Sequence, residues 1–223
     1  MSRADEIRAN AEAVDARIAA ACARAGRTRS DVQLVAVTKT FPASDVELAI
    51  AAGMSDVGEN KVQETRDKQP LVRGAARWHL IGHLQSNKAR DAVRLFDLIQ
   101  SVDRVELAEK LARHAEAARK TQDVLLQVNI GRETQKSGAE IAEVPELARR
   151  MAALPSLRLR GLMAIPPAGE PETTRAFFRD LRAMRDDLGL DELSMGMTDD
   201  FEVAIEEGAT LVRVGRAIFG SRG

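Results

Sequence analysis

Apolar residues recur along the chain in two alternating patterns. Short apolar runs of the kind that form buried strands are separated by longer segments whose apolar residues recur every three or four positions, as in amphipathic helices. The predicted strands are Val32–Lys39, Asp56–Asn60, Arg77–Gly82, Leu98–Asp103, Asp123–Ile130, Leu157–Pro166, Glu192–Thr198 and Leu211–Phe219. Helical periodicity between them is clearest over Ser44–Ala52, Val105–Lys120, Pro145–Ala153 and Thr173–Leu188.

This alternation predicts the architecture. Strands separated by helices pair in parallel, because a parallel neighbour can be reached only through a crossover. Eight strands, each but the last followed by a helical pattern, match the number that closes into a barrel. We therefore expect an α/β fold with one (β/α)8 TIM-type barrel domain over residues 1–223, and a doubly wound open sheet is the alternative. An extra helix over Ala4–Ala25, ended by Gly26, precedes the first strand.

Composition narrows the class of protein. Apolar residues make up 44% of the chain and charged residues 30%, which is typical of a soluble globular protein. The net charge of −1 gives no general attraction to nucleic acid or anionic lipid. The charged amino terminus does not resemble a secretory signal, and no apolar run approaches the roughly 20 residues that span a bilayer. With Cys22 as the single cysteine, we expect a cytoplasmic protein that binds neither nucleic acid nor membrane.

Lys39 is the sharpest candidate for chemistry. Functional residues of such barrels lie at the carboxyl ends of the strands, and Lys39 alone among seven lysines ends an apolar strand. If Val35 and Val37 face the interior, the period of two turns Lys39 inward as well. Desolvation favours the neutral amine, which Schiff-base formation with an aldehyde cofactor requires. The alternative is a lysine whose ammonium group extends into solvent.

A second candidate lies at the ends of the last two predicted strands, where this fold usually binds phosphate. Ser194 and Thr198 supply hydroxyl groups, while Gly196 and Gly215 allow the backbone to approach an anion closely. The alternative is an ordinary turn in which Thr198 or Asp199 caps the helix that follows.

Arg213 shares its parity with Leu211 and Gly215, so we expect it inside the barrel. A buried guanidinium stays protonated and needs an acceptor. That acceptor is either an acidic residue, such as Glu59 or Asp103, or the nitrogen of a bound ring.

The histidines do not indicate a metal site, because His79 and His83 lack further ligands at a suitable spacing. We interpret His79 as a packing residue and His83 as a residue of the rim. Lys136 is interpreted as a solvated loop cation, with contact to an incoming phosphate as the alternative.

Taken together, the motifs resemble those of the pyridoxal phosphate homeostasis proteins, which are relatives of the alanine racemase barrel. The resemblance runs in order through nearly the whole chain. The matching segments are Leu34–Thr40, Gly58–Glu64, Trp78–Lys88, Ser101–Arg104, Val128–Gly138, Gly161–Ile165, Leu193–Phe201 and Val212–Gly220.

The resemblance implies a monomeric barrel that binds pyridoxal 5'-phosphate as a Schiff base on a lysine. The residues implied are Lys39 for the Schiff base, Asn60 beside the cofactor, Ser194, Gly196, Thr198 and Gly215 around the phosphate, and Arg213 facing the pyridine nitrogen. Two positions depart from the family pattern. Lys61 stands where the family often has an aromatic residue, and Thr198 where it often has serine.

The residue set argues against rapid catalysis. An arginine donates a hydrogen bond to the ring nitrogen without releasing its proton, which weakens the ring as an electron sink. Racemases on this barrel add a tyrosine from a second domain, and this chain has no tyrosine. We therefore expect a protein that sequesters pyridoxal 5'-phosphate and supplies it to the apo-forms of enzymes that use it. The alternatives are a single-domain amino-acid racemase and a phosphate-binding barrel enzyme without cofactor.

Overall fold

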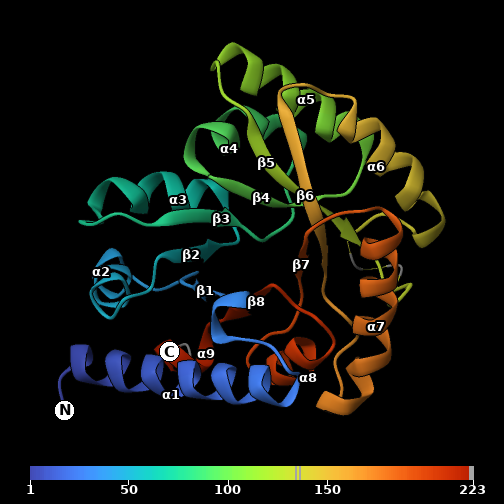
Figure 1. Ribbon diagram of the computed structural model, residues 1–223. Helices are drawn as coiled ribbons and strands as arrows, with labels where there is room; N and C mark the ends of the chain where they lie inside the picture. Colours follow the sequence, from blue (N-terminus) through green and yellow to red (C-terminus); the bar gives the residue numbers. More distant parts are fainter. Residues whose placement is uncertain (134, 136, 221–223) are drawn as a thin grey trace.

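In the computed structural model, which describes residues 1–133, 135 and 137–220, eight parallel strands close into a barrel in chain order, with helices outside it (Figure 1). The strands are β1 Gln33–Val37, β2 Asp56–Glu59, β3 Arg77–Leu80, β4 Leu98–Val102, β5 Gln122–Val128, β6 Leu157–Ala164, β7 Glu192–Ser194 and β8 Leu211–Val214. Closure occurs between β1 and β8, where Val35 lies opposite Arg213. The predicted barrel is confirmed, and the open-sheet alternative is wrong.

In the described part of the chain, helix α1 Arg3–Arg24 precedes the first strand, and a helix follows every strand. The helices that follow the strands are α2 Ala43–Ala51, α3 Val62–Lys68, α4 Ala89–Leu95, α5 Val105–Ala117, α6 Val144–Ala152, α7 Pro171–Asp187, α8 Phe201–Glu206 and α9 Arg216–Phe219. Short 3-10 turns lie at Arg29–Asp31, Gln69–Leu71, Ser86–Lys88 and Ile141–Glu143. None of the helices described here is long and apolar enough to cross a membrane.

The extra helix α1 forms as its sequence predicts. Ser2 and Asp5 make a reciprocal cap in which the Ser2 hydroxyl accepts from the Asp5 backbone N–H and the Asp5 carboxylate accepts from that of Ser2. Its apolar residues, from Ile7 to Cys22, recur at helical spacing and are buried. They pack α1 against α8 and α9, so the helix covers the side of the barrel where β8 meets β1 (Figure 1).

The strands end earlier than predicted. Lys39 lies in a turn two residues beyond β1, and β7 ends at Ser194 rather than Thr198. The predicted strand over Leu211–Phe219 is wrong after Val214, because the chain turns at Gly215 and continues as α9. An apolar run suits a strand and a buried helical turn equally well, and here packing on α1 favours the helix.

The core has two parts. Most buried apolar side chains lie between the barrel wall and its helices. A smaller cluster unites five side chains from five strands and therefore fills the barrel interior: Val35, Leu98, Leu125, Met163 and Leu211. The position of Val35 in this cluster confirms the inward parity from which the orientation of Lys39 is predicted.

Candidate functional site

Lys39 is half-buried, and residues on both sides of it are tied to α3 and β2. The Thr38 hydroxyl donates to Glu59 Oε1 at 2.7 Å, and its carbonyl oxygen accepts from Lys68 Nζ at 2.9 Å. The Thr40 backbone N–H donates to Glu64 Oε1 at 2.6 Å. Thr40 itself has a φ of 70°, which is unusual for a β-branched residue and marks a strained turn. The turn that carries Lys39 is therefore held in one conformation.

The residues that hold this turn form a buried ion-pair cluster. Lys68 Nζ lies 2.7 Å from Glu59 Oε1 and 2.8 Å from Glu64 Oε1. Burial raises the pKa of Glu59, against the opposing effect of the hydrogen bonds from Lys68 and Thr38. Lys68 was not singled out from the sequence, yet its side chain is only 8% exposed. The sequence did offer a signal for this ion pair, because Glu64 and Lys68 are four positions apart in a segment expected to be helical.

Arg213 lies inside the barrel, as predicted from its parity. Its Nη1 donates to Ser194 Oγ at 2.6 Å, and its Nη2 donates to the Ala164 carbonyl oxygen at 3.0 Å. The predicted acidic partners are wrong, since Glu59 bonds to Lys68 outside the barrel wall and Asp103 pairs with its neighbour in sequence. No carboxylate of the described residues lies within ion-pair distance of Arg213. Burial lowers its pKa to about 10, so the group remains a cation at neutral pH.

Three interior polar residues were missed as functional candidates: Asp56 on β2, His79 on β3 and Gln100 on β4. His79 Nε2 lies 2.9 Å from Asp56 Oδ1, and Gln100 Nε2 lies 2.9 Å from His79 Nδ1. The Ser194 hydroxyl donates to Gln100 Oε1 at 2.6 Å. His79 is therefore a hydrogen-bonded member of a network as well as a packing residue. The signal in the sequence was that each of these polar residues stands at an inward-facing position of its predicted strand.

The turn after β7 is shaped by Gly196, which has a φ of 86°. A Cβ at this position would lie 2.5 Å from the Ala204 Cβ atom, so only glycine fits against α8. The capping alternative for Thr198 and Asp199 is wrong: Asp200 occupies the cap position of α8, and its carboxylate accepts from the Met197 backbone N–H. The Thr198 hydroxyl makes no cap to α8 and is half-buried in the turn.

The strand register brings several predicted site residues to one rim of the barrel. Val37 is level with Gly58, and Ala36 is level with Val214. The positions just beyond these strand ends are therefore neighbours, and they are occupied by Lys39, Asn60 and Gly215. Gly215 leaves room for β1, because a Cβ there would lie 3.1 Å from the Val37 carbonyl oxygen.

His83 lies on the rim with a half-exposed side chain, and its Nδ1 is 3.2 Å from the Ser137 hydroxyl oxygen. Lys136 lies outside the described residues. In the described part of the chain, no group of three or more acidic, histidine or cysteine side chains is arranged to hold a metal ion.

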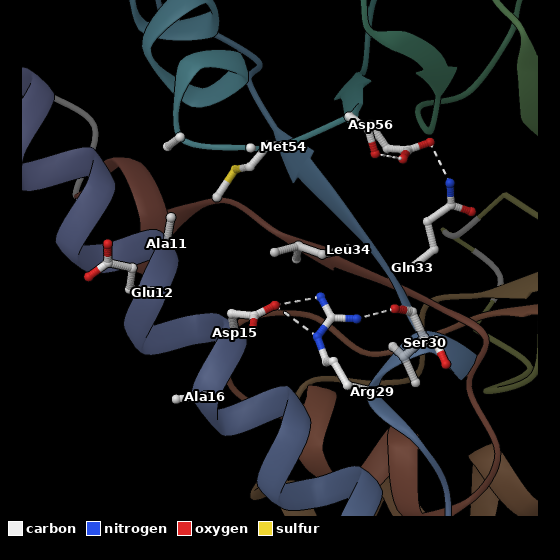
Figure 2. A pocket seen from close by; sticks show the side chains of 14 residues that line it. Ala11, Glu12, Asp15, Ala16, Arg29, Ser30, Gln33, Leu34, Met54 and Asp56 are labelled. Carbon is white, nitrogen blue, oxygen red and sulfur yellow. Dashed lines mark hydrogen bonds and ion pairs between the residues drawn. The ribbon is translucent and has the colours of Figure 1, made fainter.

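A cavity of about 850 Å³ lies at the opposite end of the barrel from Lys39. Figure 2 shows the side chains that line it. The cavity is lined by α1, the 3-10 turn before β1, and the first residues of β1 and β2. Arg29 spans it and binds the Asp15 carboxylate, while Gln33 donates to Asp56 at its inner edge. Because its one arginine is already paired, this cavity offers no cation to a phosphate.

Comparison with known proteins places the chain in a class. Residues 9–223 match the sequence model of the family described as "Alanine racemase, N-terminal domain". The barrel, the lysine after β1 and the arginine on β8 thus define a member of the alanine racemase type of barrel.

More similar relatives narrow the class further. The chain is 48% identical over 217 residues to the pyridoxal phosphate homeostasis protein of Pseudomonas aeruginosa, covering 96% of this chain and 94% of that protein. It is 44% identical over 231 residues to the protein of the same name from Escherichia coli, covering 98% and 97%. PipY of Synechococcus elongatus, solved with pyridoxal phosphate bound, aligns with a TM-score of 0.77 and 41% identity over 85% of this chain and 93% of that one. The chain belongs to the family of the pyridoxal phosphate homeostasis proteins.

Proposed function

We propose that this protein binds pyridoxal 5'-phosphate covalently on Lys39 and serves its homeostasis, storing and supplying the cofactor without substantial turnover. Two relatives support the assignment by their names, and PipY supports it through its structure with the cofactor bound. Lys39 Nζ would form the Schiff base with the aldehyde, and the aldehyde oxygen would leave as water together with the two amine protons.

The remaining contacts are proposed from the arrangement of the rim. Asn60 would lie beside the ring, because it follows β2 next to the Lys39 turn. The phosphate would be held around Gly196, Thr198, Gly215 and the backbone of Ser194, which follow or end β7 and β8, since the Ser194 hydroxyl is bonded to Gln100 and Arg213. Gly196 and Gly215 permit close approach of the backbone, and Thr198 contributes a half-buried hydroxyl.

The observation that carries this proposal is the buried cation of Arg213, which donates to two neutral acceptors, the Ser194 hydroxyl and the Ala164 carbonyl oxygen. It retains N–H groups for a further acceptor such as a pyridine nitrogen. When bound, pyridoxal phosphate serves as an electron sink, most strongly if its ring nitrogen is protonated. Arg213 keeps its own proton and so leaves that nitrogen neutral, which disfavours turnover. With no tyrosine in the chain, the tyrosine base of the two-base racemases is also absent.

We further propose that the protein acts as a cytoplasmic monomer that hands the cofactor to apo-enzymes. A single cysteine, Cys22, buried against the core, suits a reducing compartment.

Two assays with the loaded protein test the proposal. Mixing it with the apo-form of an enzyme that requires pyridoxal phosphate should restore that enzyme's activity, while the visible absorbance of the donor declines in parallel. Incubation with L-alanine, L-serine or L-glutamate should give no more D-isomer than free cofactor does. Sustained formation of D-isomer would favour a single-domain racemase instead.

A further inference from the structure

A chain of five polar side chains crosses the barrel interior from β2 to β8. It runs from Asp56 through His79, Gln100 and Ser194 to Arg213, with successive distances of 2.9, 2.9, 2.6 and 2.6 Å. All five side chains are buried, and the middle three have no exposed surface. Buried polar groups of this kind stabilise one arrangement only when every member is satisfied.

The chemistry of its ends fixes the direction of each hydrogen bond. Arg213 can only donate, so Ser194 Oγ accepts from it and uses its single hydrogen toward Gln100 Oε1. The Gln100 amide nitrogen must then face His79 and donate to Nδ1. His79 therefore carries its proton on Nε2 and donates it to the Asp56 carboxylate, which can only accept. Arg213, which can only donate, and Asp56, which can only accept, therefore require the same donor-to-acceptor direction along the whole series.

Further hydrogen bonds hold Asp56, the residue at the β2 end of this series of hydrogen bonds. The Asp56 carboxylate also accepts from Gln33 Nε2 at 2.6 Å and from the Ser55 hydroxyl at 2.7 Å. Burial opposes its charge, but these bonds and that from His79 bring the pKa of Asp56 below its ordinary value. The anchor is thus a carboxylate at neutral pH.

The chain orients its members and does not conduct protons. An amide such as Gln100 does not exchange a proton between its nitrogen and oxygen in the way that an imidazole or a hydroxyl passes one on. His79 and Ser194 are therefore separated by a group that interrupts proton transfer. The hydrogen bonds instead orient the side chains, because each acceptor fixes the rotamer of the residue that donates to it.

We propose that Gln100, His79 and Asp56 are positioning residues that act through Ser194 to hold Arg213 in one orientation, with its remaining N–H groups available to the pyridine nitrogen. The cofactor part of this inference rests on the proposed function. The order of hydrogen bonds does not, because it is a property of the protein alone.

The first test uses the wild-type protein without cofactor. Long-range ¹H–¹⁵N NMR spectra distinguish protonated from unprotonated ring nitrogens, and the chain has only three histidines, so a His79→Gln variant assigns the signal. We expect a proton on Nε2 of His79 and none on Nδ1. A proton on Nδ1 would reverse the Gln100 amide and overturn the inferred direction.

The second test compares two buried glutamines. Gln100→Met breaks the chain, whereas Gln122→Met removes an amide that donates to the carbonyl oxygens of Asp97 and Asp123 at the other end of the barrel. We expect Gln100→Met to weaken cofactor binding about ten-fold and to shift the visible absorbance maximum of the bound cofactor, since one charge-assisted contact is misplaced. Gln122→Met should match the wild type in both.

The outcomes separate the two claims. Wild-type affinity and an unchanged absorbance maximum in Gln100→Met would overturn the positioning role. A wild-type protein that gives no visible band would instead contradict the proposed function, and the NMR result would still decide the order of the hydrogen bonds.

Discussion

Replacing Lys68 with methionine should be the most damaging single change near the Lys39 turn. Lys68 Nζ donates to Glu59, Glu64 and the Thr38 carbonyl oxygen. Glu59 has no exposed surface, and without Lys68 its carboxylate keeps only the Thr38 hydroxyl as a partner. Removing one partner of a buried ion pair costs about 3–5 kcal/mol. We expect about 3 kcal/mol, because Glu64 is partly exposed and loses less.

The matched change on the other side of the pair should cost much less. Glu59→Gln keeps an acceptor oxygen for Thr38 and Lys68, and Lys68 keeps Glu64 as a counterion. Among the described residues, Glu59 Oε2 has no hydrogen-bond partner, so the substituted amide nitrogen breaks no bond there. The expected loss is about 1 kcal/mol.

The assay is urea unfolding of both single variants and the double variant at pH 7, followed by circular dichroism. We expect Lys68→Met to be about 2 kcal/mol less stable than Glu59→Gln, and Glu59→Gln to recover most of that difference in the Lys68→Met background. Equal losses, or a greater loss in Glu59→Gln, would refute the reasoning that an uncompensated Glu59 charge dominates.

Two further predictions concern stability. Gly196→Ala should lower the free energy of unfolding in urea by about 3 kcal/mol, because it combines a positive φ with a Cβ only 2.5 Å from that of Ala204. The control Gly53→Ala, at a position with a φ of 92° and open space around it, should lower it by about 1 kcal/mol. A similar loss in both variants would contradict the packing argument. The lowered pKa of Asp56 predicts that its contribution is present above its ordinary value of 3.8 and is lost as the pH falls through the lower folded value. Unfolding free energies measured from pH 5.5 to pH 3 should therefore fall less steeply in Asp56→Asn than in the wild type. Equal slopes would show that Asp56 does not contribute to the pH dependence of stability.

The sequence was sufficient for the barrel and for the parity of its inner residues. Alternating strand and helix patterns predicted eight strands, and the period of two correctly turned Val35 and Arg213 inward. The same run of apolar residues could not distinguish a strand from the short helix α9, because that choice depends on contacts with α1, some 200 positions away in sequence.

The partners of the inward residues were harder to predict. An acidic partner such as Glu59 or Asp103 was one expectation for Arg213, but Glu59 points outward to Lys68 and Asp103 pairs with Arg104. A serine and a carbonyl oxygen accept from the arginine instead, and the contact with a ring nitrogen stays a prediction. Parity identifies which side chains share the interior, whereas the pairing among them depends on strand stagger around the closed barrel. For this reason the hydrogen bonds that link His79 and Gln100 could be identified only from the three-dimensional structure.

The central claim is that Lys39 carries the cofactor, and reductive trapping tests it most directly. The wild type, Lys39→Ala and the control Lys61→Ala, which removes an exposed lysine near the same rim, are loaded with pyridoxal 5'-phosphate, reduced with borohydride and digested for peptide mass spectrometry. We predict one stoichiometric pyridoxyl adduct on the peptide that contains Lys39 in the wild type and in Lys61→Ala, and no such adduct in Lys39→Ala. Stoichiometric labelling of another lysine, or equal labelling of Lys39→Ala, would contradict it.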